Sequence, residues 1–270
     1  YVPLREQYDN SVSHALEYYI ADFALSRFAE ALGKKKDAEM FYKRSLGYKH
    51  YYSKEFGTFR PILPDGTFYS PFNPRQGENF EPNPGFHEGS AWNYSFYVPH
   101  DVYGLAKLMG GKNPFIKKLQ KVFDEGLYDP ANEPDIAYAH LFSYFRGEEW
   151  RTQKETQRLL DKYFTTKPNG IPGNDDTGTM SAWAIFNMIG FYPDCPGLPE
   201  YTLTTPVFNK VTIRLDPKWY KEKELVIESN RTQPGTLYIN KVLLNGKKFN
   251  QYRITHDELV HSQRILFDLK

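Results

Sequence analysis

The sequence has 270 residues, enough for one large domain or for one domain with an appendage. Its 34 Lys and Arg side chains nearly balance 33 Asp and Glu side chains, so no overall field favours nucleic acid or a membrane surface as partner. One cysteine excludes an internal disulfide framework and a cysteine-based zinc cluster, and no apolar run of about 18 residues predicts a membrane span. A neutral partner is expected, and the aromatic content of 17% suits sugar surfaces as well as cores.

The first residues, YVPLREQYDN, contain no initiating methionine and none of the charged and apolar regions of a signal peptide, so a processed or excised chain is expected. Apolar residues then recur at helical spacing over residues 11–32, which predicts a helix that stops at Gly33. The same pattern over residues 37–52, after a short link, predicts a second helix antiparallel to the first.

Residues 57–85 are rich in proline and glycine, and a loop of this length in a compact domain usually serves a site. A small hairpin over residues 65–74 is restricted by its prolines to a sheet edge. Helical spacing returns afterwards in residues 88–97, 101–109, 114–124, 135–145, 151–164 and 179–189.

After Pro196 the periodicity becomes strand-like. The β-rich segments are residues 211–216, 224–229, 235–249 and 264–270, and Asn245-Gly246 is a strong hairpin signal. So few strands are marginally stable alone, and we expect them to pack on the helices or to complete a sheet. The sequence predicts a mainly α fold, with a helical domain over residues 1–205 and a small C-terminal β segment over residues 206–270.

The loop GIPGNDDTGTMSAW, residues 170–183, places an amide and two adjacent carboxylates, Asn174, Asp175 and Asp176, among glycines and ahead of a helix. Adjacent carboxylates cannot both ionise freely unless a cation or hydrogen-bond donors stabilise them. Such a group of side chains can supply a catalytic base or a metal ligand. A solvated turn followed by a helix cap is the alternative interpretation.

Glu88 stands where the proline-rich loop meets an aromatic segment that contains Trp92. A carboxyl group among rings loses hydration, which raises its pKa and suits it to act as a general acid. The alternative is a glutamate favoured at a helix start by the helix dipole. His87 and His100 are expected to pack or cap, because no metal-ligand spacing accompanies them.

In DPANEPD, residues 129–135, Asn132 and Glu133 precede a proline at the head of a predicted helix. Their oxygens are hard ligands that suit calcium, although a helix cap explains them too. All three acidic loops precede predicted helices. In a ring of helical hairpins such ends converge on one mouth, where two carboxyl groups could hydrolyse a sugar.

Several segments carry a resemblance to a known family. HEGSAWNYSFYVPHDVYGLAKLMGG, NEP and GIPGNDDTGTMSAWAIFNMIGFYPDCPG, with YVPL and QYDNSVSHALEYYIADF before them, resemble the C-terminal part of the family 92 glycoside hydrolases, which are calcium-dependent exo-α-mannosidases. The resemblance implies an (α/α)6-type toroid of helical hairpins, present in part and followed by the β segment, and a periplasmic or secreted location. The implied substrate is a mannose-containing oligosaccharide or N-glycan.

The resemblance also implies roles for individual residues. Glu88, in Glu-Gly-x-Ala-Trp, takes the role of general acid, and Asp176, in Asn-Asp-Asp-x-Gly, takes that of general base, with Asp175 supporting it. Inversion requires the two acting carboxyl groups to lie about 6.5–9.5 Å apart. The implied substrate-binding residues are Trp92, Asn132, Glu133 and Asn174. The implied Ca²⁺ ligands are Asn132, Glu133 and Asp176.

The sequence departs from the family pattern beside Asn132 and Glu133, where Pro130-Ala131 and Asp135-Ile136-Ala137 stand in place of histidine-containing flanks. The family's β-sandwich and first hairpins have no counterpart here, so an N-terminal part of the same protein is the expected partner. Two alternatives are another (α/α)-barrel carbohydrate enzyme and a non-catalytic carbohydrate-binding or interaction module.

Overall fold

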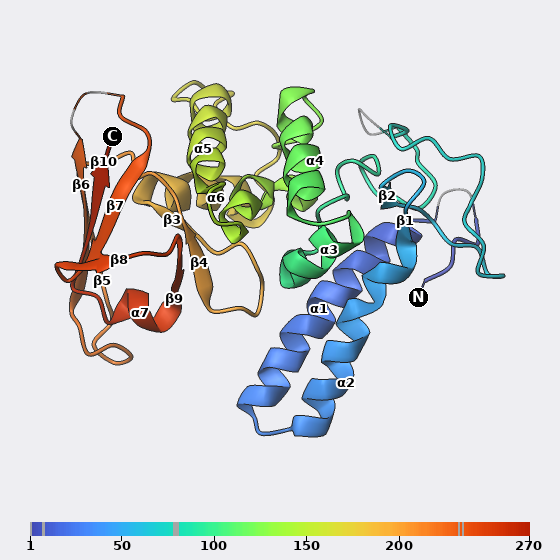
Figure 1. The fold of residues 1–270 in the computed structure, drawn as a ribbon, viewed down its shortest axis with the longest axis horizontal. Coiled ribbons are helices and arrows are strands. Elements are labelled where there is room, and N and C mark those ends of the chain that lie inside the picture. Colours follow the sequence, from blue (N-terminus) through green and yellow to red (C-terminus); the bar gives the residue numbers. More distant parts are fainter. Residues whose placement is uncertain (1, 7–8, 78–80, 232, 234) are drawn as a thin grey trace. The chain divides into compact units, whose positions relative to one another are not determined.

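The computed structural model describes residues 2–6, 9–77, 81–231, 233 and 235–270 (Figure 1). The chain forms two compact units: the first contains Tyr1–Tyr138 and Cys195–Leu198, and the second contains Ala139–Asp194 and Pro199–Lys270. The predicted boundary after residue 205 marks the change from helical to strand-like periodicity, whereas these two units are defined by compactness. The boundary therefore stays a prediction. In the part of the chain that the structure describes, no helix is long and apolar enough to cross a membrane.

The first unit begins with a helical hairpin, α1 (Ser11–Ala31) and α2 (Lys35–Ser45), whose helices lie side by side (Figure 1). Gly33 has φ +71° in the link, and the Ser26 hydroxyl on α1 donates to the Ala38 carbonyl oxygen on α2 at 2.8 Å. The predicted antiparallel pair is confirmed. The second helix ends earlier than predicted and continues as the 3₁₀ helix η1 (Leu46–Tyr51).

Two short strands and two helices follow in this unit. The strands β1 (Tyr52–Ser53) and β2 (Thr58–Phe59) pair antiparallel. After the long loop come η3 (Pro99–Asp101), α3 (Val102–Leu108) and α4 (Lys112–Asp124), which confirm both predicted helices. The predicted hairpin over residues 65–74 is wrong, because the chain reverses earlier and pairs Ile62 with Phe68.

The helix predicted over residues 88–97 is also wrong, and the structure has bends and turns there. The Asn93 side chain accepts hydrogen bonds from the Ser90 backbone N–H and hydroxyl, both at 2.9 Å. Such side-chain bonds offer the backbone an alternative to a helix. The helix predicted over residues 135–145 is replaced by the 3₁₀ helices η4 (Glu133–Asp135) and η5 (Tyr138–Tyr144).

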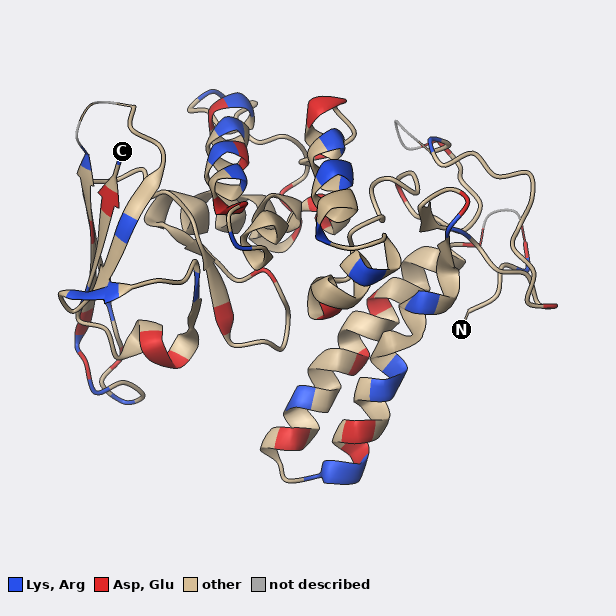
Figure 2. Cartoon of the chain, viewed as in Figure 1, with Lys and Arg blue, Asp and Glu red and all other residues tan. Residues whose placement is uncertain are grey.

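The second unit contains α5 (Glu149–Tyr163) and α6 (Thr179–Ile189), close to the predicted bounds, with the 3₁₀ turn η6 (Asp176–Gly178) before α6. Trp183 on α6 is 2% exposed and stacks on Phe164 with ring centroids 5.5 Å apart. Figure 2 shows Lys and Arg interspersed with Asp and Glu along α5, the pattern of a solvated helix face.

Two sheets complete the second unit. The five-stranded sheet has the order β5 (Lys210–Arg214), β6 (Glu224–Arg231), β10 (Arg264–Leu269), β7 (Ile239–Leu244) and β8 (Lys247–Phe249). The three-stranded sheet has the order β3 (Phe191–Tyr192), β4 (Glu200–Leu203) and β9 (Arg253–Thr255). The short helix α7 (His256–Val260) follows β9 and carries a capping box from Thr255 and Glu258.

The strand predictions are confirmed, because each β-rich segment contributes to the five-stranded sheet. Alternate residues of β6 and β10, among them Leu225, Ile227, Ile265 and Phe267, point into one apolar core. Asn245 and Gly246 form the predicted hairpin turn between β7 and β8, with φ of 48° and 80°. The left-handed backbone at both central residues is what a two-residue turn between twisted strands requires.

Candidate active site

Glu88 lies in a strained loop of the first unit. Its φ of +48° is in the left-handed region, which a residue with a Cβ adopts at a cost of about 1–3 kcal/mol. The side chain is 57% exposed, and its Oε1 lies 3.7 Å from Nε2 of His87. The expected burial of this carboxyl among rings is therefore wrong for this structure, and its carboxyl is open to solvent instead.

Asn132 holds the Glu88 loop rather than capping a helix. It precedes η4 without making a side-chain cap, and its Nδ2 donates to the Glu88 carbonyl oxygen at 2.7 Å. The side chain is buried, with 5% of the residue exposed, whereas Glu133 next to it is exposed. The structure thus brings Glu88, Asn132 and Glu133 into one part of the first unit and removes the helix-cap interpretation of Asn132.

Two tyrosines accompany these residues. The Tyr97 hydroxyl donates to Oε1 of Glu17 at 2.7 Å, and burial together with the Glu17 charge raises the pKa of Tyr97 well above its ordinary value. Burial also raises the pKa of Tyr94 to about 12, and the charges of Glu17 and Glu88 add to the increase. Glu17 on α1 was not singled out from the sequence, because its contact with Tyr97 joins residues 80 positions apart.

Trp92 is half-buried, and cations occupy the space over its ring. Nζ of Lys118 lies 4.8 Å from the ring centroid, and Nζ of Lys121 lies 5.1 Å from it. Lys118 also donates to the Gly57 carbonyl oxygen. Burial, with the nearby Lys121 charge, lowers the pKa of Lys118 to about 7. A role of Trp92 in sugar binding stays a prediction.

In the second unit, Asp175 anchors the start of α6. Its Oδ1 accepts hydrogen bonds from the backbone N–H groups of Met180 at 2.9 Å and Ser181 at 3.0 Å, and its Oδ2 accepts from the Ser181 hydroxyl. These bonds, the hydroxyl bond first, lower the pKa of Asp175. Because a helix begins with unsatisfied N–H groups, the helix-cap interpretation holds for this carboxylate.

Asp176 has a different environment. It is exposed, its backbone carbonyl oxygen accepts from the hydroxyls of Thr177 at 2.7 Å and Thr179 at 2.6 Å, and within the described residues its carboxylate has no hydrogen-bond partner. Thr177 has φ +52° and Gly178 has φ +78°, so the chain turns sharply between Asp176 and α6. Asn174 is exposed beside them.

The predicted acid and base lie in different compact units, Glu88 in the first and Asp176 in the second. Their predicted separation of about 6.5–9.5 Å stays a prediction. Within the described residues no three His, Cys, Asp or Glu side chains form a group that could hold a metal. The oxygens of Asn132 and Glu133 are of the type that Ca²⁺ prefers.

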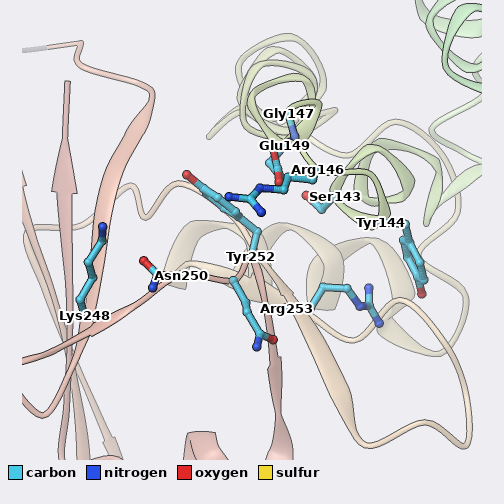
Figure 3. A pocket seen from close by; sticks show the side chains of 10 residues that line it. Ser143, Tyr144, Arg146, Gly147, Glu149, Lys248, Asn250, Tyr252 and Arg253 are labelled. Atoms are coloured by element: carbon cyan, nitrogen blue, oxygen red, sulfur yellow. Dashed lines mark hydrogen bonds between the residues drawn. The ribbon is translucent and has the colours of Figure 1, made fainter. Parts of the chain in front are cut away.

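Each unit also has a cavity. One of about 450 Å³ in the first unit is lined in part by His14 and by Asn10, whose Nδ2 lies 3.2 Å from Nδ1 of His87. One of about 920 Å³ in the second unit lies between the start of α5 and the segment from β8 to β9, with Arg146 and Lys248 on its walls (Figure 3). No predicted site residue lines the larger cavity, so it is not the predicted active site.

Glu88 and Asp176, two exposed acidic residues, thus lie in loops with left-handed backbone at Glu88 itself and at Thr177. The whole chain, residues 1–270, matches the family described as the glycosyl hydrolase family 92 catalytic domain. The chain belongs to this family of glycosidases.

Individual proteins similar to this chain are also described as glycosidases. The GH92 α-mannosidase BT3965 of Bacteroides thetaiotaomicron has 31% identity and a TM-score of 0.88, over 97% of this chain and 34% of its own. The inverting GH92 mannosidase BT2199 of the same organism has 31% identity and a TM-score of 0.86, over 97% of this chain and 37% of its own. A protein of Arthroderma benhamiae described as an uncharacterized secreted glycosidase is 26% identical over 265 residues, which cover 92% of this chain and 34% of that protein.

The chain therefore spans about a third of the length of these relatives. The structural matches confirm the predicted fold class, a partial (α/α)6-type arrangement of helices followed by a small β segment.

Proposed function

We propose that the protein containing this chain removes terminal α-linked mannose from a mannose-containing oligosaccharide or N-glycan, with inversion at the anomeric carbon. The observation that carries the proposal is backbone strain. Among the described non-glycine residues, positive φ occurs at Glu88, Thr177 and Asn245. Asn245 is in a hairpin turn, and the other two are in the loops of the proposed acid and base. Strain of this kind concentrates at functional sites.

In the proposed reaction, Glu88 donates a proton to the departing glycosidic oxygen, and Asp176 accepts a proton from the water that attacks the opposite face of the sugar. The two adjacent carboxylates, Asp175 and Asp176, have different roles in this proposal. Asp175 is occupied by the N–H groups of α6, so Asp176 remains available to the water. The proposed sugar contacts are Trp92, Asn132, Glu133 and Asn174.

A calcium ion belongs to the proposal. Asn132 and Glu133, with Asp176, would hold it, and when bound it would orient and polarise sugar hydroxyls. Two structural relatives, described as an α-mannosidase and an inverting mannosidase, support the proposed substrate and stereochemistry. The name of the fungal relative supports a secreted or periplasmic location. We also propose that residues beyond this chain, from the N-terminal part of the protein, complete the pocket.

Hydrolysis of manno-oligosaccharides of defined linkage by the whole protein tests the proposal, with NMR to read the configuration of the mannose first released. We expect β-mannose from an α-linked substrate. Glu88→Gln should lower turnover about 10²–10⁴-fold and leave binding of the oligosaccharide intact. Unchanged turnover would refute the role of Glu88. Binding without turnover in the unaltered protein would favour the non-catalytic carbohydrate-binding module. The family match already argues against another type of (α/α)-barrel enzyme.

A further inference from the structure

The loop that carries Glu88 is held by side chains from other segments. Nδ2 of Asn132 donates to the Glu88 carbonyl oxygen at 2.7 Å, and Nδ2 of Asn83 donates to the Gly89 carbonyl oxygen at 3.1 Å. The Tyr94 hydroxyl donates to the His87 carbonyl oxygen at 2.7 Å. Three consecutive backbone carbonyls therefore depend on side-chain donors, which keep the Glu88 backbone in its strained conformation.

One buried carboxylate, Asp135, connects two of the segments that hold this loop. It is 0% exposed, and its Oδ2 accepts from the Asp129 backbone N–H at 2.6 Å and from Nδ2 of Asn93 at 3.0 Å. Its Oδ1 is buried and has no hydrogen-bond partner within the described residues. A single oxygen atom thus receives two donors from different segments.

Both donors, Asn93 and the Asp129 backbone, belong to segments that contact the Glu88 loop. Oδ1 of Asn93 accepts from the backbone N–H of Ser90, two residues after Glu88, at 2.9 Å. The bond from Asp129 closes the loop 129–135, and Asn132 lies on that loop. The Asp135 backbone N–H also donates to the Asn132 carbonyl oxygen at 3.2 Å. Moving or removing the Asp135 acceptor would therefore loosen both the Ser90 side and the Asn132 side of the Glu88 loop.

We infer that Asp135 is a positioning residue, which fixes the carboxyl of Glu88 for proton donation by holding Asn93 and the Asn132 loop through one buried oxygen atom. The inference rests on the proposed role of Glu88 as general acid. Asp135 touches no reacting atom in this scheme. Its contribution is the geometry of proton transfer, so its loss should matter most where the leaving group needs a proton.

The experiment compares two substrates of the whole protein. Phenyl α-mannoside has a poor leaving group that needs the acid, whereas 2,4-dinitrophenyl α-mannoside has a good leaving group that departs without a proton. Asp135→Leu removes the acceptor, and we expect kcat to fall at least about tenfold for the phenyl substrate and less than about threefold for the dinitrophenyl substrate. Asp135→Asn should restore the phenyl rate, because its amide oxygen can receive both hydrogen bonds.

A matched control is Asp22→Leu, which removes another buried carboxylate of the first unit, one that pairs with Arg44 at 3.1 Å and, among the described residues, makes no hydrogen bond or ion pair with the Glu88 loop. It should leave the ratio of the two rates unchanged. If Asp135→Leu does not fold, Ser90→Ala provides a milder variant, since it removes the hydroxyl bond to Asn93, and it should change the ratio in the same direction.

The outcomes distinguish the positioning role of Asp135 from the acid role of Glu88. Equal loss of both rates in Asp135→Leu and in Ser90→Ala, or loss in neither variant, would overturn the positioning role. Glu88→Gln is measured in parallel. If that variant hydrolyses the phenyl substrate as fast as the unaltered protein does, the proposed acid itself is wrong, whatever Asp135 does.

Discussion

Removal of Arg253 should destabilise the second unit by a few kcal/mol. Nη1 of Arg253 lies 2.7 Å from Oδ2 of Asp194, whose side chain is fully buried, and the guanidinium lies 3.9 Å from the ring centroid of Tyr144. Breaking a buried ion pair from one side costs about 3–5 kcal/mol, because the remaining charge stays buried without its partner. Asp194 keeps a hydrogen bond from the Thr202 hydroxyl at 2.7 Å, which places Arg253→Met near the lower end of that range.

Replacement of Asp194, the other partner of this ion pair, should destabilise the second unit less than replacement of Arg253. Asp194→Asn leaves Arg253 with Glu200, 3.2 Å away, and with partial access to water, since 15% of its side chain is exposed. The order of destabilisation is therefore Arg253→Met first and Asp194→Asn second. Urea denaturation followed by circular dichroism measures both changes, and the double variant gives the coupling energy. A loss below about 1 kcal/mol for Arg253→Met would refute the reasoning, because that is the value of an exposed ion pair.

Substitutions at positions 175 and 176 should separate a structural role from a chemical one. We expect Asp175→Ala to lower both the melting temperature and turnover, because α6 loses its anchor, whereas Asp176→Asn should lower turnover about 10²–10⁴-fold at an unchanged melting temperature; equal melting losses in calorimetry would contradict this. Lys118 has its pKa lowered to about 7 by burial, while the unfolded chain keeps that proton until about pH 10.4. The unfolded state then binds more protons, so the free energy of unfolding should rise from about pH 7 to about pH 10, and Lys118→Met should flatten that rise in urea titrations. Chelation with EDTA should abolish mannose release by the whole protein and added Ca²⁺ should restore it; full activity in EDTA would exclude the proposed ion.

Local sequence predicted the positions of the acidic loops but not their conformations. Adjacent carboxylates before a helix indicated either a catalytic base or metal ligand, or a solvated turn followed by a helix cap, and in the structure Asp175 binds the N–H groups of Met180 and Ser181 at the start of α6. The motif around Glu88 indicated the family, but the helix predicted over residues 88–97 does not form, because the Asn93 side chain accepts hydrogen bonds from Ser90. Residue types located the loops, and side-chain hydrogen bonds between residues three to six positions apart decided their conformation.

Other parts of the site had no signal at short range. The contacts of Asn132 with Glu88 and of Tyr97 with Glu17 join residues 44 and 80 positions apart. The parallel pairing of β6 with β10 likewise joins segments that nothing in their own periodicity connects. Such pairs depend on how the intervening chain folds, so a pattern read along the sequence does not contain them.

The sequence by itself determined the long amphipathic helices, the change from helix to strand, the Asn245-Gly246 turn and the loops on which the family motif lies. These features depend on periodicity and on backbone preferences over a few residues, which are encoded locally. Only the tertiary structure decided that Glu88 has a strained backbone, that Asp175 is bound to α6 while Asp176 is open, and that Asp135 is buried and bound to Asn93 and Asp129. Burial and hydrogen-bond partners depend on the folded arrangement of the chain, and they divide similar carboxyl groups into structural and chemical roles.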